Sequence, residues 1–224
     1  MLPRIHTLSI GTPKDYEDER GIWQSAIGRQ SVSKPVYLDW GGHVGDKVAD
    51  TKNHGSPDQA VCCHPLEHYH YWNERYGLSM ETGLSPGAVG ENWTIVGANE
   101  KSICIGSTYR VGDALVQVSG PRFPCSKQER KVKIPGFLQE VARTMRSGFY
   151  MRVLLPGEVE VGDALEVVDC PHPDVTVADA NACIHEEIDP TVAERVLAAE
   201  ELNDFWRRII QHSLDTYREQ PSLF

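Results

Sequence analysis

Long hydrophobic runs are missing from this sequence. No apolar stretch reaches the roughly 18 residues that a membrane-spanning helix needs. No positively charged segment followed by a long apolar run opens the chain, as a secretion signal would. These absences predict a protein of the cytoplasm with no membrane partner.

Cysteine is also sparse, with six residues in a chain of 224. This number is too small for a dense disulfide framework in a chain of this length. Cys62 and Cys63 are adjacent, and neighbouring residues of a strand point to opposite faces. The pattern therefore predicts free thiols in a reducing compartment.

Positive charge is scarce as well, because 22 Lys and Arg face 32 Asp and Glu, a net charge of -10. Such a protein repels nucleic acid, so no nucleic-acid partner is expected. Residues 120–152 are the exception, with eight Lys or Arg against two Glu, a net charge of +6. Two interpretations stay open for this basic segment: a site for a small anion such as phosphate, or a solvated face.

One cysteine lies at the start of the basic segment, in the stretch Gly120–Lys127. Pro121 and Pro124 fix the backbone around it and set the direction of its side chain. Arg122 and Lys127 flank Cys125, and nearby positive charge favours the thiolate, which is both a nucleophile and a soft metal ligand. The alternative is a buried, inert cysteine on a proline-rich turn.

Alternating residues and a repeat indicate a mainly β fold. Residues 4–10 and 32–38 are expected strands, and 12–31 is expected to be a loop. Residues 109–118 and 159–168 repeat a strand, a Gly-Asp turn and a second strand, and residues 43–48 are a partial third copy. Repeated strand–turn–strand units predict a closed, barrel-like β domain with a few helices, over residues 1–170.

The last part of the chain, residues 171–224, is expected to be a small three-helix appendage. Thr176 and Asp179 have the spacing of a capping box, and Asp189 followed by Pro190 predicts a second helix start. An apolar stripe along 201–219 predicts a third helix that packs against a core. Because prolines mark a change of composition after Val168 and no candidate ligand lies beyond it, deletion of 174–224 is expected to leave a folded β domain that still binds its ligand.

Two further helices are expected within the β domain, over residues 65–76 and 135–146. The first carries His64-Pro-Leu-Glu-His68, which matches the H-x-x-E-H pattern of a class of zinc peptidases. Pro65 places His64 at the frayed end of that helix, so solvent-facing or capping histidines are the favoured interpretation over a zinc site.

Several motifs occur in the order seen in MOSC-domain proteins, and the chain resembles their YiiM-like branch, which adds a C-terminal three-helix domain. The motifs are Lys34-Pro35, Gly45-Asp46, His54-Gly55, Gly90-Glu91-Asn92, Cys104-Ile-Gly106 and Pro121-Arg122-x-Pro-Cys125. The chain departs from the pattern at Gly120, where glutamine is expected, and at Ser56, where glycine is expected.

This resemblance implies a β-barrel that binds the molybdenum cofactor, a pterin dithiolene with a terminal phosphate. It implies that Cys125 is the molybdenum ligand and that the enzyme reduces N-hydroxylated bases or amidoximes. Reduction of N–OH needs two electrons and protons, so Glu91 or His54 is the expected proton donor. The predicted cofactor-binding residues are Arg122, Lys34, Arg152, Lys127, Gly90 and Asn92.

The sequence has no motif for flavin, haem or an iron–sulfur cluster, so electrons are expected to come from a partner protein. Two other functions stay open. One is a sulfur-transfer protein with Cys125 as persulfide carrier, and the other is a non-catalytic cofactor-binding or delivery protein. Neither the small-molecule substrate nor the oligomeric state follows from the sequence.

Overall fold

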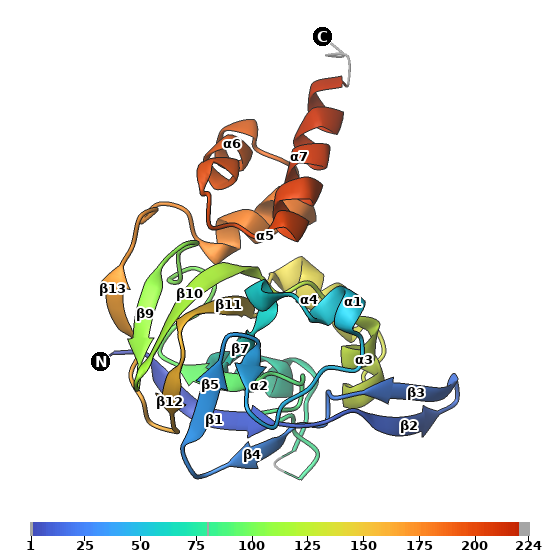
Figure 1. Ribbon diagram of the computed structural model, residues 1–224. Helices are drawn as coiled ribbons and strands as arrows, with labels where there is room; N and C mark the ends of the chain where they lie inside the picture. Colours follow the sequence, from blue (N-terminus) through green and yellow to red (C-terminus); the bar gives the residue numbers. More distant parts are fainter. Residues whose placement is uncertain (1, 80, 220–224) are drawn as a thin grey trace.

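The computed structural model describes residues 2–79 and 81–219, and its centre is an eight-stranded sheet (Figure 1). The strand order is β13-β9-β10-β11-β7-β8-β1-β4, and neighbours are antiparallel except for the parallel pair β7–β8. The strands are β1 (Arg4–Ile10), β4 (Gln30–Val32), β7 (Val61–Pro65), β8 (Trp93–Val96), β9 (Thr108–Val111), β10 (Ala114–Pro121), β11 (Phe149–Leu155) and β13 (Glu166–Asp169).

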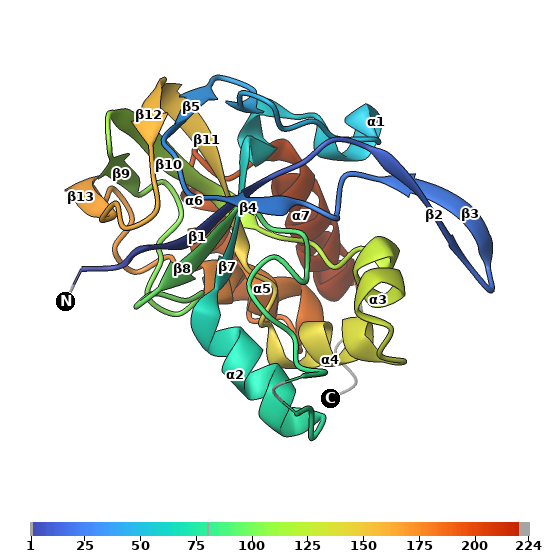
Figure 2. The same cartoon turned by 90° about the horizontal axis from the view of Figure 1, so that it is seen from below.

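Two smaller sheets accompany the large one. Strands β5 (Val36–Asp39), β6 (Gly42–His43) and β12 (Gly157–Val159) form a three-stranded sheet in the order β12-β5-β6. Strands β2 (Lys14–Asp18) and β3 (Gly21–Ser25) form a hairpin that projects from the body of the molecule (Figure 2).

Helices surround one side and one end of the large sheet. They are α1 (Thr51–His54), α2 (Leu66–Arg75), α3 (Ser126–Val132), α4 (Phe137–Thr144), α5 (Val177–His185), α6 (Pro190–Ala198) and α7 (Asp204–Glu219). The last three stack together at one end, as Figure 1 shows. Among residues 2–79 and 81–219, no helix has both the length and the apolar character needed to cross a membrane.

The large sheet is curled but open, so the expectation of a closed barrel is wrong. Its described edge strands, β13 and β4, do not pair with each other. The segment just before β13 does reach β1, where the backbone N–H of Ile5 donates to the carbonyl of Asp163 at 3.0 Å. Closure stops there because β4 pairs with the other end of β1, at Leu8 to Ile10.

The segment 12–31 contains the β2–β3 hairpin, so its interpretation as a loop is wrong. Tyr16 and Trp23 are direct cross-strand partners whose rings stack at 4.7 Å. The guanidinium of Arg130 lies over the Trp23 ring at 4.7 Å. Cross-strand aromatic contact and the cation–π contact stabilise strands that the polar composition did not predict.

Two other strand predictions need correction. The expected strand 32–38 is divided into β4 and β5, because Pro35 has no N–H to donate to a ladder. The first repeat forms the β9–β10 hairpin, as expected. The second does not form a hairpin, since β12 pairs with β5 and β13 pairs with β9.

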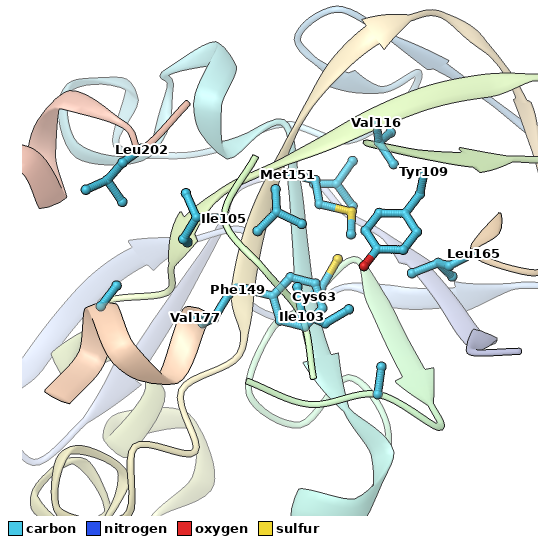
Figure 3. Packing of buried hydrophobic residues seen from close by; sticks show 14 of the residues in the cluster. Cys63, Ile103, Ile105, Tyr109, Val116, Phe149, Met151, Leu165, Val177 and Leu202 are labelled. Atoms are coloured by element: carbon cyan, nitrogen blue, oxygen red, sulfur yellow. The ribbon is translucent and has the colours of Figure 1, made fainter. Parts of the chain in front are cut away.

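The first two C-terminal helices begin where the sequence predicts, and α7 begins at Asp204, three residues after the predicted start of the third. Thr176 and Asp179 form the capping box of α5, and the Asp189 carboxylate accepts hydrogen bonds from two N–H groups at the start of α6. These helices and the sheet contribute to one hydrophobic cluster. Figure 3 shows Val177 of α5 and Leu202 packed in the same cluster as Phe149 of β11.

Because the core is shared, deletion of 174–224 would expose a large apolar surface of the sheet, which argues against a folded remainder. The predicted domain boundary between residues 170 and 171 stays a prediction.

His64 and His68 are both buried, so their interpretation as solvent-facing or capping residues is wrong. His64 belongs to β7 rather than to α2. The Nε2 of His68 lies 2.8 Å and 3.0 Å from the two carboxylate oxygens of Glu100, which is also buried. This pair connects α2 to the loop after β8.

Another buried histidine, His43, is expected to make the stability of the fold depend on pH. The indole N–H of Trp93 donates to Nε2 of His43 at 2.8 Å, which requires a neutral acceptor. Burial lowers the pKa of His43 from 6.5 to about 4. Between these two pH values His43 is protonated in the unfolded chain but neutral in the folded chain. We therefore expect the free energy of unfolding to fall as pH decreases from 6.5 to about 4.

The measurement is urea unfolding at about pH 7 and about pH 5. His43→Gln keeps an acceptor for the indole but does not titrate, so its loss of stability between the two pH values should be smaller. An equal loss in the variant and the parent chain would contradict this prediction.

Candidate functional site

The stretch that carries Cys125 connects the end of β10 to the start of α3. The backbone N–H of Arg122 donates to the carbonyl of Gly148 at 3.0 Å, which continues the pairing of β10 with β11 for one more residue. Cys125 directly precedes α3, and its N–H donates to the side-chain oxygen of Gln128 at 2.9 Å. Both ends of this segment, residues 120–125, are therefore fixed; we call it the cysteine loop.

A cleft of about 650 Å³, including space open to solvent, lies against this loop. Six of the residues predicted from the sequence line it: His54, Gly90, Asn92, Arg122, Cys125 and Lys127. They come from α1, the loop before β8 and the cysteine loop with the first turn of α3, three segments far apart in the sequence.

Arg122 is the buried cation of the cleft. Its side chain is 6% exposed, and Nη2 donates to the carbonyl of Val89 at 2.6 Å. Nη1 is buried and has no hydrogen-bond partner among the described residues. A buried guanidinium nitrogen without a partner is costly unless an acceptor binds it. Arg122 can therefore receive an anionic group that enters the cleft.

Glu91, one of the two candidate proton donors, does not line the cleft. It is fully buried, and its Oε1 accepts hydrogen bonds from the Tyr69 hydroxyl at 2.7 Å, the Gly87 N–H at 2.7 Å and the Thr94 hydroxyl at 2.6 Å. These contacts hold the loop before β8 in place. The structure thus gives Glu91 a role in the shape of the site, because its carboxylate faces the protein interior.

Replacing Glu91 with glutamine is expected to lower stability by about 1–2 kcal/mol, because three charge-assisted hydrogen bonds become neutral ones. The amide oxygen of Gln still accepts from the same donors, so the loop keeps its shape and the cleft its lining. Urea unfolding measures the loss of stability. Retention of a ligand in the cleft tests whether the lining of the cleft is unchanged. A variant that is fully stable but has lost all binding in the cleft would contradict this assignment.

Arg152 and Lys34 are the two predicted cofactor-binding residues that the structure does not bring to the cleft. The guanidinium of Arg152 donates to Asp58, to Gln117 and to the carbonyl of Glu201, at 2.7–2.8 Å. It therefore ties β11 to the segment before α7. Lys34 is exposed in the turn between β4 and β5.

His54, the other candidate proton donor, is half-buried at the end of α1 and lines the cleft. Burial lowers its pKa below 6.5, and the positive charge of Arg122 lowers it further. The structure therefore leaves His54 as the sequence-predicted proton donor that faces the cleft.

Several lining residues were missed by the sequence analysis, notably Arg29, Cys62 and Tyr150. Arg29 makes a two-pronged ion pair with Asp46, through Nε at 2.9 Å and Nη2 at 2.8 Å. Asp46 also accepts from Nδ2 of Asn92 at 3.0 Å. This network fixes Asn92, whose side-chain oxygen in turn accepts from the Cys62 N–H at 3.1 Å.

Cys62 is the one of these that the sequence could have revealed. Strand alternation places Cys62 and Cys63 on opposite faces of β7, and Cys63 belongs to the hydrophobic core. Cys62 therefore had to face the other side, where the cleft lies. Gly90 is needed close by, since a Cβ there would lie 2.3 Å from Cγ1 of Ile27.

The basic segment 120–152 is not one continuous surface. Arg130 pairs with Asp18 at 2.6 Å, and Arg143 pairs with Glu140 at 2.7 Å. Lys131 donates to the carbonyls of Ile27 and Gly87, and burial lowers the pKa of this amine to about 8. Of the eight cations, Arg122 and Lys127 line the cleft, so the interpretation as an anion site stays a prediction for these two residues.

Comparison with known proteins identifies the family of this chain. The family model "MOSC domain" matches residues 50–166. The protein YflK of Bacillus subtilis is 36% identical over 91% of this chain and 90% of its own length. A protein of Gibberella moniliformis named "Reductase" is 34% identical over 71% of this chain, but the match covers 28% of that protein.

Among solved structures, that of YiiM from Geobacillus stearothermophilus superimposes with a TM-score of 0.78 and 32% sequence identity. The match covers 95% of this chain and 99% of that one. The resemblance found in the sequence motifs is thus confirmed over nearly the whole chain. The chain belongs to the MOSC domain family.

Proposed function

We propose that this protein is a reductase of N-hydroxylated compounds, such as hydroxylaminopurine-type bases or amidoximes, that binds the molybdenum cofactor with Cys125 as molybdenum ligand. The observation that carries the proposal is a half-buried thiol in one cleft with a buried guanidinium whose Nη1 has no partner among the described residues. MOSC domains are associated with molybdenum cofactor binding, and a relative named as a reductase supports an oxidoreductase.

The donor set fits the cofactor. Thiolate is a ligand for soft metals, so Cys125 suits a molybdenum centre. Arg122 and Lys127 carry the positive charge that a phosphate-bearing pterin needs, and a guanidinium can bind phosphate through two parallel hydrogen bonds. When bound, the molybdenum centre supplies the two-electron chemistry, while the protein supplies orientation and charge.

The protein's own contribution to the reduction is a proton. Converting N–OH to N–H consumes two electrons and two protons and releases water, so a proton donor beside the substrate accelerates the step. His54 fills this role in the cleft. Because its pKa lies below 6.5, the protonated form grows as pH falls, and we expect turnover to rise with acidity until the fold itself weakens.

The test is reduction of an N-hydroxylated base by purified, cofactor-loaded protein with an artificial electron donor. Turnover that is lost in His54→Ala at neutral pH but retained in Lys34→Ala is the expected result. Protein that carries molybdenum yet reduces no N-hydroxylated substrate would contradict the reductase and favour a delivery protein.

A second function, sulfur transfer through a Cys125 persulfide, is favoured by one observation. Cys62 lines the same cleft, which places a second thiol in the space where a persulfide would react. Metal content separates the two functions, because a sulfur-transfer protein needs no stable molybdenum. The physiological electron donor of the reductase is proposed to be a separate protein.

A further inference from the structure

The backbone at the start of the cysteine loop is held by α7 and the residue that precedes it. The indole N–H of Trp206 donates to the carbonyl of Pro121 at 2.6 Å. The carbonyl of Ser119 accepts two hydrogen bonds from Asn203, one from its backbone N–H at 2.8 Å and one from its side-chain Nδ2 at 2.9 Å. Ser119 and Pro121 come just before Arg122, so α7 fixes the chain where the loop leaves β10.

These contacts lie in the interior. Ser119 is fully buried, Trp206 is 1% exposed and Asn203 is 7% exposed. Asn203 also accepts, through Oδ1, from the backbone N–H of Trp206 at 3.1 Å, so the two residues are fixed relative to each other. A buried carbonyl that loses its donor cannot turn to water, which makes each of these bonds costly to remove.

Gly120 allows this close approach. A Cβ at position 120 would lie 2.5 Å from Nδ2 of Asn203 and 3.2 Å from Cδ1 of Trp206. The φ angle of Gly120 is +153°, which also favours glycine. Gly120 is one of the two positions where the chain departs from what the resemblance implies, since glutamine is expected there. The space that a side chain would need at this position is filled by Asn203.

The side chain of Phe123 strengthens the contact from inside the loop. Its ring centroid lies 5.9 Å from that of Trp206 and 5.4 Å from that of Phe205. Such edge-to-face and tilted aromatic pairs add to the burial they bring. The loop therefore touches α7 through its backbone before Arg122 and through the side chain after it.

We infer that Trp206 and Asn203 are positioning residues, which act through the backbone of Ser119 and Pro121 to keep Arg122 and Cys125 facing the cleft. The C-terminal helices would then be part of the site and not an appendage to it. The inference rests on the proposed function only in treating the cysteine loop as the site. Neither residue lines the cleft itself.

The test uses the full-length chain without added cofactor. Trp206→Phe removes the indole N–H and keeps an aromatic ring. Asn203→Ser keeps a cap for α7 and the backbone N–H donor to the Ser119 carbonyl, but loses the side-chain Nδ2 donor. Trp72→Phe is the matched control, because Trp72 is fully buried and its indole N–H has no partner among the described residues. Trp72 belongs to a smaller hydrophobic cluster, separate from the main core, with Tyr69, Val89, Phe137 and Val141. Amide hydrogen exchange of residues 119–126 and the alkylation rate of Cys125 are measured in each chain.

Loss of one buried hydrogen bond is expected to speed exchange of the loop about tenfold in both variants. Alkylation of Cys125 should become faster, while Cys104 and Cys170, which are also half-buried, serve as internal references with unchanged rates. Trp72→Phe should lower the unfolding midpoint without changing either rate at the loop. If Trp206→Phe does not fold, Asn203→Ser alone decides the result.

Exchange and alkylation rates equal to those of the parent chain, in every variant that folds, would overturn the inference. Molybdenum content is a separate readout. A chain that binds no molybdenum but shows the faster loop would refute the proposed function and leave the positioning role intact.

Discussion

Replacing Arg122 with alanine is expected to weaken cofactor retention by about one to two decades. A charge-assisted hydrogen bond contributes roughly 1.5–3 kcal/mol, which corresponds to that factor in a dissociation constant. Nη1 of Arg122 is buried and without a partner among the described residues, so the contact to an anionic group is available. Arg122→Lys should recover only part of the loss, because the planar fork is gone. Retention is measured as molybdenum remaining after gel filtration.

Arg152→Ala is the matched control for this experiment. Arg152 also makes several buried or half-buried hydrogen bonds, but it does not line the cleft. The Arg152→Ala variant should have a lower free energy of unfolding than the parent chain but should retain the cofactor. If Arg152→Ala and Arg122→Ala release molybdenum equally, the effect of Arg122 is structural, and its role in cofactor binding is refuted.

Replacing Cys125 with serine is expected to abolish molybdenum binding. A serine hydroxyl is a hard, protonated donor where the thiolate is a soft one, so the covalent link to the metal is lost. The fold should not change, because Cys125 is half-buried and its N–H keeps its bond to Gln128. Metal analysis and a urea unfolding curve of the same preparation test both statements.

Cys62→Ser provides the comparison, since Cys62 lines the same cleft but is not the proposed ligand. It should retain molybdenum. The opposite result, with molybdenum lost from Cys62→Ser and kept by Cys125→Ser, would show that the ligand is on β7 and that the cysteine loop has another purpose.

The sequence correctly predicted those features that depend on residues close together in the chain. The capping box at Thr176 and the Asp189-Pro190 start depend on residues within three positions, and both occur as expected. The same holds for the Gly-Asp turn between β9 and β10. The motif around Cys125 also placed Arg122 and the thiol in one cleft, because they lie three residues apart and Pro124 restricts the backbone between them.

The other features of the fold and the cleft depend on contacts between residues far apart in the chain, and such contacts produce no pattern in the sequence. Arg29 lines the cleft because Asp46 fixes its guanidinium, and the two residues lie in segments that look like turns. Glu91 belongs to the predicted motif, yet Tyr69 and Thr94 turn its carboxylate inward. The open sheet follows from β4 pairing with β1, which strand spacing alone could not indicate.

The molybdenum content of the purified chain, produced together with cofactor biosynthesis, tests the central claim most directly. The account predicts about one molybdenum per chain, bound through the single thiolate of Cys125. A chain that carries no molybdenum, under conditions that load another molybdenum enzyme expressed in parallel, would contradict it.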